Sequence, residues 1–331
     1  MELFATPDNP VPPGAVVSQV AASDGVNLRV ARWSPRGRKS PRGTVCILQG
    51  RAEFIEKYFE TVTDLTNRGF VVVAFDWRGQ GGSDRQVANA RKGHVASFKR
   101  YRRDLDAVLT EVVTRHCPAP YFALAHSMGA TILFDCLGHG ETRFERVVAS
   151  APMLSVALVK RPRLVRCLAE VLGAIGFARQ FVPGGGATAI STKPFRDNRL
   201  TSDPVRYARN AAITAAAPQV GLGDPTIGWV KAAYRLMAQL GTRRAAEAIK
   251  AQVLIVAAGA DTVVSTPVIE RFALHLKSGH VIVLPGARHE LLMERDSIRS
   301  AFWAAFDAFI PGTDDLGRQP PQADKALSAM A

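Results

Sequence analysis

Cysteine is scarce in this chain of 331 residues, and its four copies form no C-x-x-C pair and no metal-ligand spacing. Cys46 and Cys136 lie in apolar runs, where a free cysteine packs as a small hydrophobic residue. The pattern argues against a disulfide-stapled scaffold and against a cysteine-ligated zinc site. It predicts a protein kept in a reducing cytoplasm.

Long apolar runs are also missing. No stretch approaches the length of about 18 apolar residues that a transmembrane helix needs, so we expect none. Residues 1–14 are rich in proline and lack the basic start and apolar stretch of a signal peptide. We therefore expect a cytoplasmic protein, in which any contact with a membrane is peripheral and at the inner face.

Acidic residues are outnumbered, with 29 Asp and Glu against 42 Lys and Arg and a formal charge of +13. The basic residues gather in 36–42, 85–103 and 156–182. A positive field of this kind favours anionic partners. No nucleic-acid motif accompanies the charge, so we expect no nucleic-acid partner. Two interpretations stay open, which are peripheral contact with an anionic membrane and charge spread over solvated faces.

Hydrophobic residues make up 47% of the chain, enough for one large domain with a sizeable core. Short apolar runs predict strands at Val16–Ala21, Asn27–Trp33, Thr44–Leu48, Phe70–Phe75, Tyr121–Ala125, Val147–Ser150, Gln252–Ala257 and His280–Leu284. Helical spacing predicts helices at Phe54–Arg68, Ser97–His116, Met128–Leu137, Pro267–Leu276 and Glu290–Phe309. This alternation is typical of an α/β fold with a mostly parallel central sheet and helices on both faces.

The alternation stops between residues 154 and 249, where the pattern is helical or irregular. We interpret this segment as a helical cap, or lid, inserted over the carboxyl edge of the sheet, where ligands bind in such folds. The core then comprises residues 1–153 and 250–310, and residues 311–331 form a disordered tail. The alternative is a separate helical domain with no role at the site.

The strongest local signal is the run from Ala125 to Gly129, which reads AHSMG. It follows an apolar strand and opens a helix, which is the context of the G-x-S-x-G nucleophile elbow. Small residues must flank the serine because the turn is tight. Gly129 meets this need, and Ala125 stands where glycine is usual. The pattern makes Ser127 the candidate nucleophile.

A serine hydroxyl needs a base, and the base needs a carboxylate that orients it. In folds with this elbow the acid and then the histidine follow the serine in the chain, each after a strand. Asp261 follows the strand Gln252–Ala257, and His289 follows the strand His280–Leu284. The sequence therefore predicts a Ser127, Asp261 and His289 triad.

Acyl transfer also needs N–H donors for the oxyanion. The Met128 amide follows the nucleophile directly, and the Arg51 amide lies in the glycine-containing loop after the strand Thr44–Leu48. The Arg51 side chain is a separate matter, with a phosphate or a surface carboxylate as its expected partner. The glycine-rich loop 76–84 lacks the ending of a P-loop, so we interpret it as structural. We expect no cofactor and no metal.

Six separated blocks carry a family resemblance over residues 16–309. They are GRAEFIEKY (50–58), FDWRGQGGSDR (75–85), GHVASFKRYRRDL (93–105), AHSMGA (125–130), AGADTVV (258–264) and GARHELLMERD (286–296). In combination they resemble the lysophospholipase and monoacylglycerol-lipase branch of the α/β-hydrolase superfamily, most closely the bacterial lysophospholipases. The resemblance implies the same triad, the oxyanion donors Arg51 and Met128, and a cap that shapes an acyl pocket. Gln49, where histidine often stands, and Ala125 depart from the family pattern.

These observations predict a serine carboxylic-ester hydrolase, a lysophospholipase that releases a fatty acid from single-chain lipids through an acyl-enzyme. The alternative within this class is a monoacylglycerol lipase or a general carboxylesterase. A non-catalytic binding protein that keeps the fold is an alternative of another class. The expected partner is a small-molecule lipid ester, and the sequence carries no signal for the oligomeric state.

Overall fold

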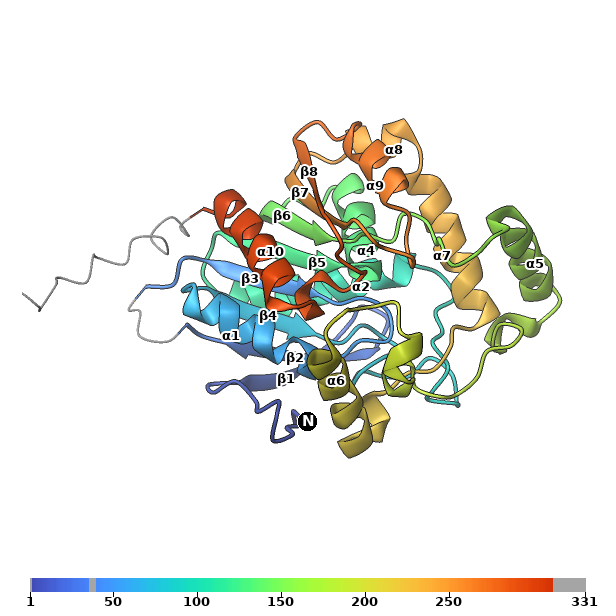
Figure 1. Ribbon diagram of the computed structural model, residues 1–331, viewed down its shortest axis with the longest axis horizontal. Helices are drawn as coiled ribbons and strands as arrows, with labels where there is room; N and C mark the ends of the chain where they lie inside the picture. The colour runs from blue at the N-terminus through green and yellow to red at the C-terminus, as the bar shows by residue number, and fades with distance from the viewer. Residues whose placement is uncertain (1, 36–39, 312–331) are drawn as a thin grey trace, which may run out of the picture.

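The computed structural model describes residues 2–35 and 40–311, and its centre is one eight-stranded sheet (Figure 1). The strands lie in the order β1-β2-β4-β3-β5-β6-β7-β8. Their bounds are β1 Val16–Ala21, β2 Asn27–Trp33, β3 Thr44–Leu48, β4 Val71–Phe75, β5 Tyr121–His126, β6 Phe144–Ser150, β7 Gln252–Ala258 and β8 Gly279–Leu284. β1 and β2 pair antiparallel, as do β2 and β4, and all other neighbours are parallel. The predicted mainly parallel sheet with an antiparallel edge hairpin is confirmed.

Helices cover both faces of the sheet (Figure 1). Their bounds are α1 Phe59–Asn67, α2 Lys99–Val108, α3 Thr114–His116, α4 Met128–Gly138, α5 Pro162–Ala174, α6 Pro204–Ala216, α7 Ile227–Leu240, α8 Arg243–Glu247, α9 Thr266–Ala273 and α10 Asp296–Phe309. Helices α1 and α10 bury Phe59 and Phe306 in one apolar core. Helices α2, α4 and α9 bury Leu105, Ile132 and Phe272 in the other. β3 and β4 are buried along their whole length between these cores, which explains their unbroken apolar sequences.

Several element boundaries differ from the sequence-based prediction. The last long helix begins at Asp296 rather than at Glu290, because Leu291–Met293 form a separate 3-10 turn. The Glu294 carboxylate accepts the backbone N–H groups of Arg288 and Arg295, which holds the chain in an extended break before the helix. α2 begins at Lys99 rather than at the predicted Ser97. The Ser97 hydroxyl lies before the helix and accepts the Lys99 N–H.

Residues 154–249 contain α5, α6, α7 and α8 and no strand, as the sequence predicts. α7 packs against α4 and buries Leu236 in the core that α4 shares, whereas α5 contacts α7 and projects from the molecule (Figure 1). Within residues 2–35 and 40–311, no helix combines the length and the apolar composition that crossing a bilayer requires. The predicted tail, from residue 312 on, and the basic residues 36–39 lie outside the described residues.

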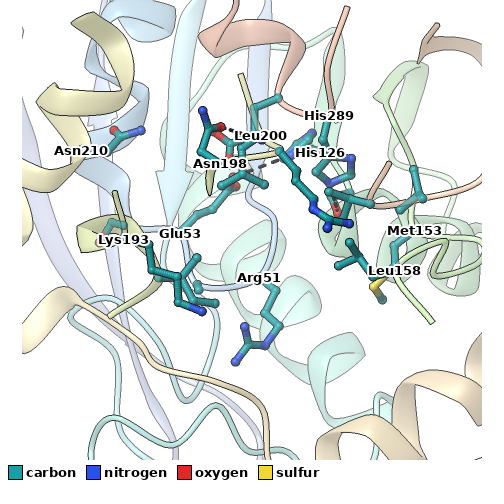
Figure 2. A pocket seen from close by; sticks show the side chains of 18 of the residues that line it. Arg51, Glu53, His126, Met153, Leu158, Lys193, Asn198, Leu200, Asn210 and His289 are labelled. Carbon is teal, nitrogen blue, oxygen red and sulfur yellow. Dashed lines mark hydrogen bonds and ion pairs between the residues drawn. The ribbon is translucent and has the colours of Figure 1, made fainter. Parts of the chain in front are cut away.

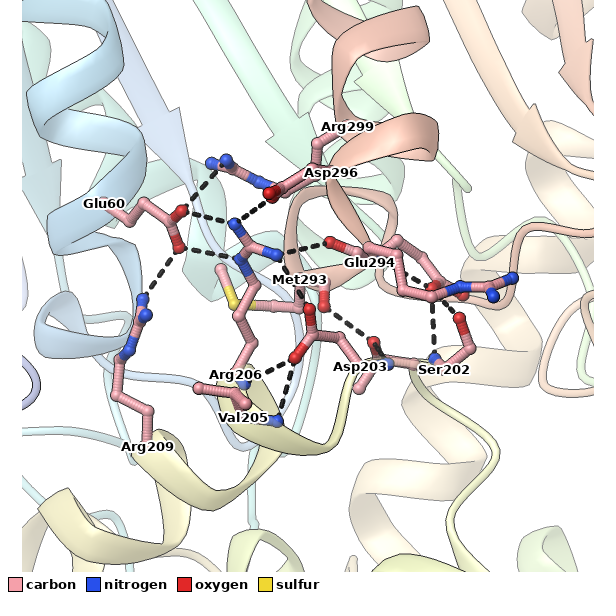
Figure 3. Close-up of polar contacts among 12 residues, drawn as sticks. Glu60, Ser202, Asp203, Val205, Arg206, Arg209, Met293, Glu294, Asp296 and Arg299 are labelled. Atoms are coloured by element: carbon pink, nitrogen blue, oxygen red, sulfur yellow. Dashed lines mark hydrogen bonds and ion pairs between the residues drawn. The ribbon is translucent and has the colours of Figure 1, made fainter.

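An ion cluster centred on Glu60 of α1 joins α6 to α1 and α10 (Figure 3). Its carboxylate accepts hydrogen bonds from Arg206 and Arg209 of α6 and from Arg299 of α10. Burial acts to raise the pKa of Glu60, but the three arginines outweigh it and lower the pKa to about 2. The cluster therefore joins the middle of the chain to helices from both of its ends.

We expect Glu60→Gln to lower the free energy of unfolding more at neutral pH than at acidic pH. Because the pKa falls on folding from its ordinary value of 4.5 to about 2, the carboxylate stabilises the fold above that range, and this stabilisation is lost as the pH falls through it. Loss of a charge-assisted contact predicts a decrease of about 1.5–3 kcal/mol in the free energy of unfolding at pH 7. Thermal melts at pH 7 and pH 3 measure it.

Glu111→Gln is the matched control, because Glu111 pairs with Arg115 at the surface, where an ion pair contributes little. The control should melt like the wild type at both pH values. A Glu60→Gln deficit that is as large at pH 3 as at pH 7 would contradict the assignment.

Candidate active site

Ser127 occupies a strained turn between β5 and α4. Its φ is +50°, a conformation that non-glycine residues rarely adopt and that costs about 1–3 kcal/mol. Gly129 follows because a Cβ there would lie 2.3 Å from the Leu48 carbonyl oxygen of the neighbouring strand. Ala125 is a buried residue of β5 in register with Leu48, so its methyl group fits within the strand. The predicted elbow is therefore present with alanine upstream.

The structure brings the three predicted triad residues together (Figure 2 shows His289 in the cavity wall). His289 Nε2 lies 3.0 Å from Ser127 Oγ, and His289 Nδ1 lies 2.8 Å from Asp261 Oδ2. Ser127 follows β5, and Asp261 and His289 follow β7 and β8. The three strands run parallel, so their carboxyl ends meet at one edge of the sheet. Both distances are within hydrogen-bond range for proton transfer.

Backbone amides hold the Asp261 carboxylate on the side away from His289. Oδ1 accepts the N–H groups of Val263 at 2.7 Å and Val264 at 3.0 Å. Burial acts to raise the pKa of Asp261, but the hydrogen bond from His289 and the two amides outweigh it and lower the pKa. The ionised carboxylate can only accept a hydrogen bond, so His289 Nδ1 carries the hydrogen and Nε2 is left as the acceptor for the Ser127 hydroxyl.

His126 lies beside His289 in the cavity wall. The two rings lie 4.9 Å apart between centroids, and His126 Nδ1 lies 3.2 Å from the Ser150 carbonyl oxygen. Burial lowers the pKa of His126 to about 4, against the opposing charge of Glu53. His126 is therefore neutral at neutral pH and adds no charge beside the base.

A buried ionic cluster supports the loop that follows β3, and the sequence analysis missed it. Lys57 Nζ lies 2.6 Å from both Glu53 Oε1 and Glu290 Oε1. The Glu53 carboxylate also accepts the Gly50 N–H and the Tyr58 hydroxyl, the latter at 2.7 Å. The cluster links the loop after β3 to the residue that follows His289. The signal available was the spacing of four residues between Glu53 and Lys57 in the segment EFIEKY.

The pKa values in the cluster follow from this geometry. Burial acts to raise the pKa of Glu53, but Lys57, His126 and the Tyr58 hydroxyl outweigh it and lower the pKa to about 2. Burial acts to lower the pKa of Lys57, and Glu290 and Glu53 together raise it. Glu53 is therefore the ionised acceptor that fixes the Gly50 amide.

Of the two predicted oxyanion donors, Met128 directly follows Ser127 in the chain, and Arg51 lines the same cavity as Ser127. Met128 is the first residue of α4, where N–H groups have no acceptor within the helix. Arg51 lies between two fixed amides, because Gly50 donates to Glu53 and Ala52 donates to Gln80. The turn needs Ala52 at φ +61°, a left-handed conformation. Arg51, Ala52 and Ser127 line one cavity.

This cavity of about 420 Å³ opens over the triad and is mostly apolar. The cavity draws its walls from the sheet edge and from residues 154–249, and its apolar lining includes Met153, Val156, Leu158, Ile190, Leu200 and Trp229. Its size is that of a small-molecule site. Within residues 2–35 and 40–311, no three His, Cys, Asp or Glu side chains are grouped to hold a metal ion.

Residues 39–296 match the family described as Serine aminopeptidase, S33. The chain belongs to this S33 hydrolase family. It is 32% identical to lysophospholipase L2 of Escherichia coli K12 over 86% of this chain and 85% of that one. It is 26% identical to a monoacylglycerol lipase of Mycolicibacterium smegmatis over 83% of this chain and 90% of that one.

Solved structures share the fold of this S33 family member. A soluble variant of monoglyceride lipase from Saccharomyces cerevisiae superimposes with a TM-score of 0.70 over 89% of this chain and 94% of that one, at 18% identity. This similarity confirms the predicted α/β-hydrolase fold. The predicted resemblance to the lysophospholipase and monoacylglycerol-lipase branch is also confirmed, by the relatives named above.

We expect Glu53→Gln in this S33 hydrolase to lower kcat rather than to raise KM. Glutamine removes the negative charge and presents an amide that cannot accept all three donors, so the Gly50 turn loses its fixed geometry. Loss of one hydrogen bond to a charged group, about 1.5–3 kcal/mol, predicts a decrease in kcat of about 10- to 100-fold. Hydrolysis of p-nitrophenyl butyrate measures it.

Asp24→Asn is the matched control, because hydrogen bonds from Arg78 lower the pKa of Asp24 to about 2 as well, but Asp24 lies outside the cavity. It should lose stability while kcat stays at the wild-type value. If both variants lose the same fraction of kcat, Glu53 acts only through stability and the positioning role is wrong.

Proposed function

We propose that this protein is a serine carboxylic-ester hydrolase that releases the fatty acid of single-chain lipids, as a lysophospholipase. The observation that carries the proposal is the hydrogen-bonded chain from Ser127 through His289 to Asp261, of which Ser127 and His289 line an apolar cavity. The chemistry fits a nucleophile, a base and an orienting acid. The apolar wall fits an acyl chain. The names of the E. coli and M. smegmatis relatives support lipid esters as substrates.

In the acylation step, Ser127 Oγ attacks the ester carbonyl carbon while His289 Nε2 takes its proton. The carbonyl oxygen gains negative charge and is stabilised by the Arg51 and Met128 amides. Collapse of the tetrahedral intermediate breaks the ester bond, and His289 gives its proton to the leaving alcohol. Asp261 stays ionised throughout and stabilises the imidazolium.

In the deacylation step, water replaces the alcohol. His289 takes a proton from the water, whose oxygen attacks the acyl carbon of the acyl-enzyme. The same two amides stabilise the second intermediate. The proton then returns to Ser127 Oγ as the fatty acid leaves, so the enzyme is regenerated without a cofactor.

Residues 154–249 act in this proposal as the cap that shapes the acyl pocket. Ile190 and Leu200 from this segment line the cavity above Ser127. The ion cluster at Glu60 holds α6 against α1 and α10, which fixes one side of the cap. The other side, α5, contacts α7.

The lysophospholipase assignment competes with a monoacylglycerol lipase, a general carboxylesterase and an aminopeptidase. An aminopeptidase must pair the ammonium group of its substrate with a carboxylate. The buried carboxylates of the cavity are engaged, because Glu53 and Glu290 both bind Lys57. This arrangement favours esters over peptides with a free amino terminus.

We expect Ser127→Ala to abolish fatty-acid release from lysophosphatidylcholine and from monoacylglycerol, with a loss in kcat on the order of 10⁶. The variant should keep the wild-type melting temperature or exceed it, since the strained turn remains and only a hydroxyl is removed. Release of fatty acid from both substrates, by wild type and variant in parallel, is the measurement. Labelling of wild type, but not of the variant, by a fluorophosphonate is the accompanying readout.

Faster release from the phospholipid supports the lysophospholipase. Faster release from the neutral lipid assigns a monoacylglycerol lipase or a general esterase with the same triad. Turnover of an aminoacyl p-nitroanilide in place of both esters would assign a peptidase. Full activity of Ser127→Ala would remove the mechanism altogether.

We also propose that α5 brings the enzyme to an anionic membrane. Its apolar side chains Leu164, Leu168, Val171 and Ile175 follow a helical spacing of four, three and four, and each is between 49% and 63% exposed. Basic side chains accompany this stripe at Lys160, Arg161, Arg163, Arg166 and Arg179. An apolar stripe flanked by cations is typical of a helix that lies in the membrane interface. Leu158, which lines the cavity and is itself exposed, precedes the helix.

We expect Leu168→Glu to abolish co-sedimentation with phosphatidylglycerol liposomes at low salt. The exposed side chain contributes little to folding, while a carboxylate in the stripe opposes both burial and the anionic surface. Leu274→Glu is the matched control, since Leu274 is 79% exposed and follows α9. The control should bind like the wild type. Failure of the wild type to bind these liposomes would overturn the proposal, and so would equal binding by Leu168→Glu.

A further inference from the structure

The Arg51 side chain is a partly buried cation in the cavity wall. Its Nη2 donates to the Gly223 carbonyl oxygen at 2.6 Å, and its Cζ lies 5.2 Å from the centroid of the Trp229 ring. Its Nε is buried and has no acceptor among the described residues. Among the described residues, no carboxylate forms an ion pair with the Arg51 guanidinium. Buried donors of a charged group are normally paired, so the unpaired Nε favours an anion from outside the chain at this site.

The acid whose charge acts on Arg51 is Asp224, and that carboxylate is already engaged. Its Oδ2 accepts the Gly186 N–H at 3.0 Å, and its Oδ1 lies 3.7 Å from Lys193 Nζ. Burial lowers the pKa of Arg51 to about 10, against the opposing effect of Asp224. The guanidinium is therefore still a cation at neutral pH, and among the described residues no carboxylate lies within ion-pair distance of it.

The direction of the Arg51 side chain relates this charge to the reacting ester. The residue begins at the amide proposed to hold the oxyanion, and Figure 2 shows its guanidinium pointing away from His126 and His289. In a lysophospholipid, a glycerol backbone separates the ester from the phosphate. The aliphatic part of an arginine spans a similar length. A substrate whose carbonyl lies on the Arg51 amide can therefore extend its head group along the Arg51 side chain.

We propose that the Arg51 guanidinium binds the phosphate of a lysophospholipid and sets the preference of the enzyme for phosphorylated over neutral single-chain esters. The inference rests on the proposed ester hydrolysis and adds the head-group contact to it. Arginine suits this role because its planar fork matches phosphate oxygens and its face stacks on an aromatic ring, here that of Trp229.

The other cations of the cavity are less suited to this contact. Lys57 is held between Glu53 and Glu290. Lys193 is half-exposed and Arg199 is exposed at the rim, where solvent screens their charge. The competing explanation for Arg51 is a purely structural tie between the oxyanion loop and Gly223. That explanation predicts equal losses on all esters when Arg51 is replaced.

The test compares two monomeric esters with one acyl chain, 1-hexanoylglycerol and 1-hexanoyl-glycerophosphoglycerol, so that membrane binding plays no part. For Arg51→Gln we expect kcat/KM on the phosphodiester to fall about 10- to 100-fold relative to kcat/KM on the neutral ester, the range for one hydrogen bond to a charged group. Arg51→Lys keeps the charge without the fork or the stacking, and should restore part of the ratio.

Arg85→Gln is the matched control. Arg85 Nη2 donates to the Gln219 carbonyl oxygen at 2.6 Å, so it also ties a loop to residues 154–249, but it does not line the cavity. Its variant should leave the ratio at the wild-type value. An equal loss on both esters in Arg51→Gln would overturn the inference and leave a structural tie. Absence of hydrolysis of either ester by the wild type would overturn the proposed function instead.

If Arg51→Gln fails to fold, a second measurement tests the proposal with the wild type and Arg51→Lys. Glycerol 3-phosphate should inhibit wild-type hydrolysis of p-nitrophenyl butyrate competitively, and the inhibition constant should rise at least several-fold in Arg51→Lys. No competitive inhibition of the wild type, or an unchanged constant in Arg51→Lys, would count against phosphate binding at this residue.

Discussion

Parallel strands end at a common edge of a sheet, and the arrangement of the site depends on this constraint. β3, β5, β7 and β8 all deliver a polar loop to that edge. The four loops are far apart in the chain, yet they bring Arg51, Ser127 and His289 to one cavity, with Asp261 hydrogen-bonded to His289. Tight packing at the edge then demands small residues, such as Gly129 against the Leu48 carbonyl.

The constraint also explains which parts of the site can be predicted from sequence. The order of the strands and the residues that follow them are local features, so the elbow, the acid and the histidine are visible in the pattern. The contacts that hold these groups are not local. Lys57 in isolation has the appearance of a surface residue on an amphipathic helix, and only the fold shows that it lies between two buried carboxylates.

Boundaries of elements were predicted less well, for reasons visible in particular residues. The sequence predicts that β6 begins at Val147, because charged Glu145 and Arg146 interrupt the apolar run before it. In the structure β6 begins at Phe144, which pairs with Tyr121 of β5. The helix predicted from Glu290 is divided where the Glu294 side chain takes over backbone donors. In both cases a tertiary or side-chain contact overrides the local periodicity. The boundaries of the cap, at 154 and 249, remain a prediction.

The positions of the four cysteines in the fold have a practical consequence. Cys46, Cys117 and Cys136 are buried, and burial raises the pKa of each thiol, so all three resist alkylation. Cys167 is exposed and lies on α5, beside Leu168. The natural sequence therefore carries one selectively reactive thiol at the place where a polarity-sensitive fluorophore reports most directly on the surroundings of that helix, without any engineered cysteine.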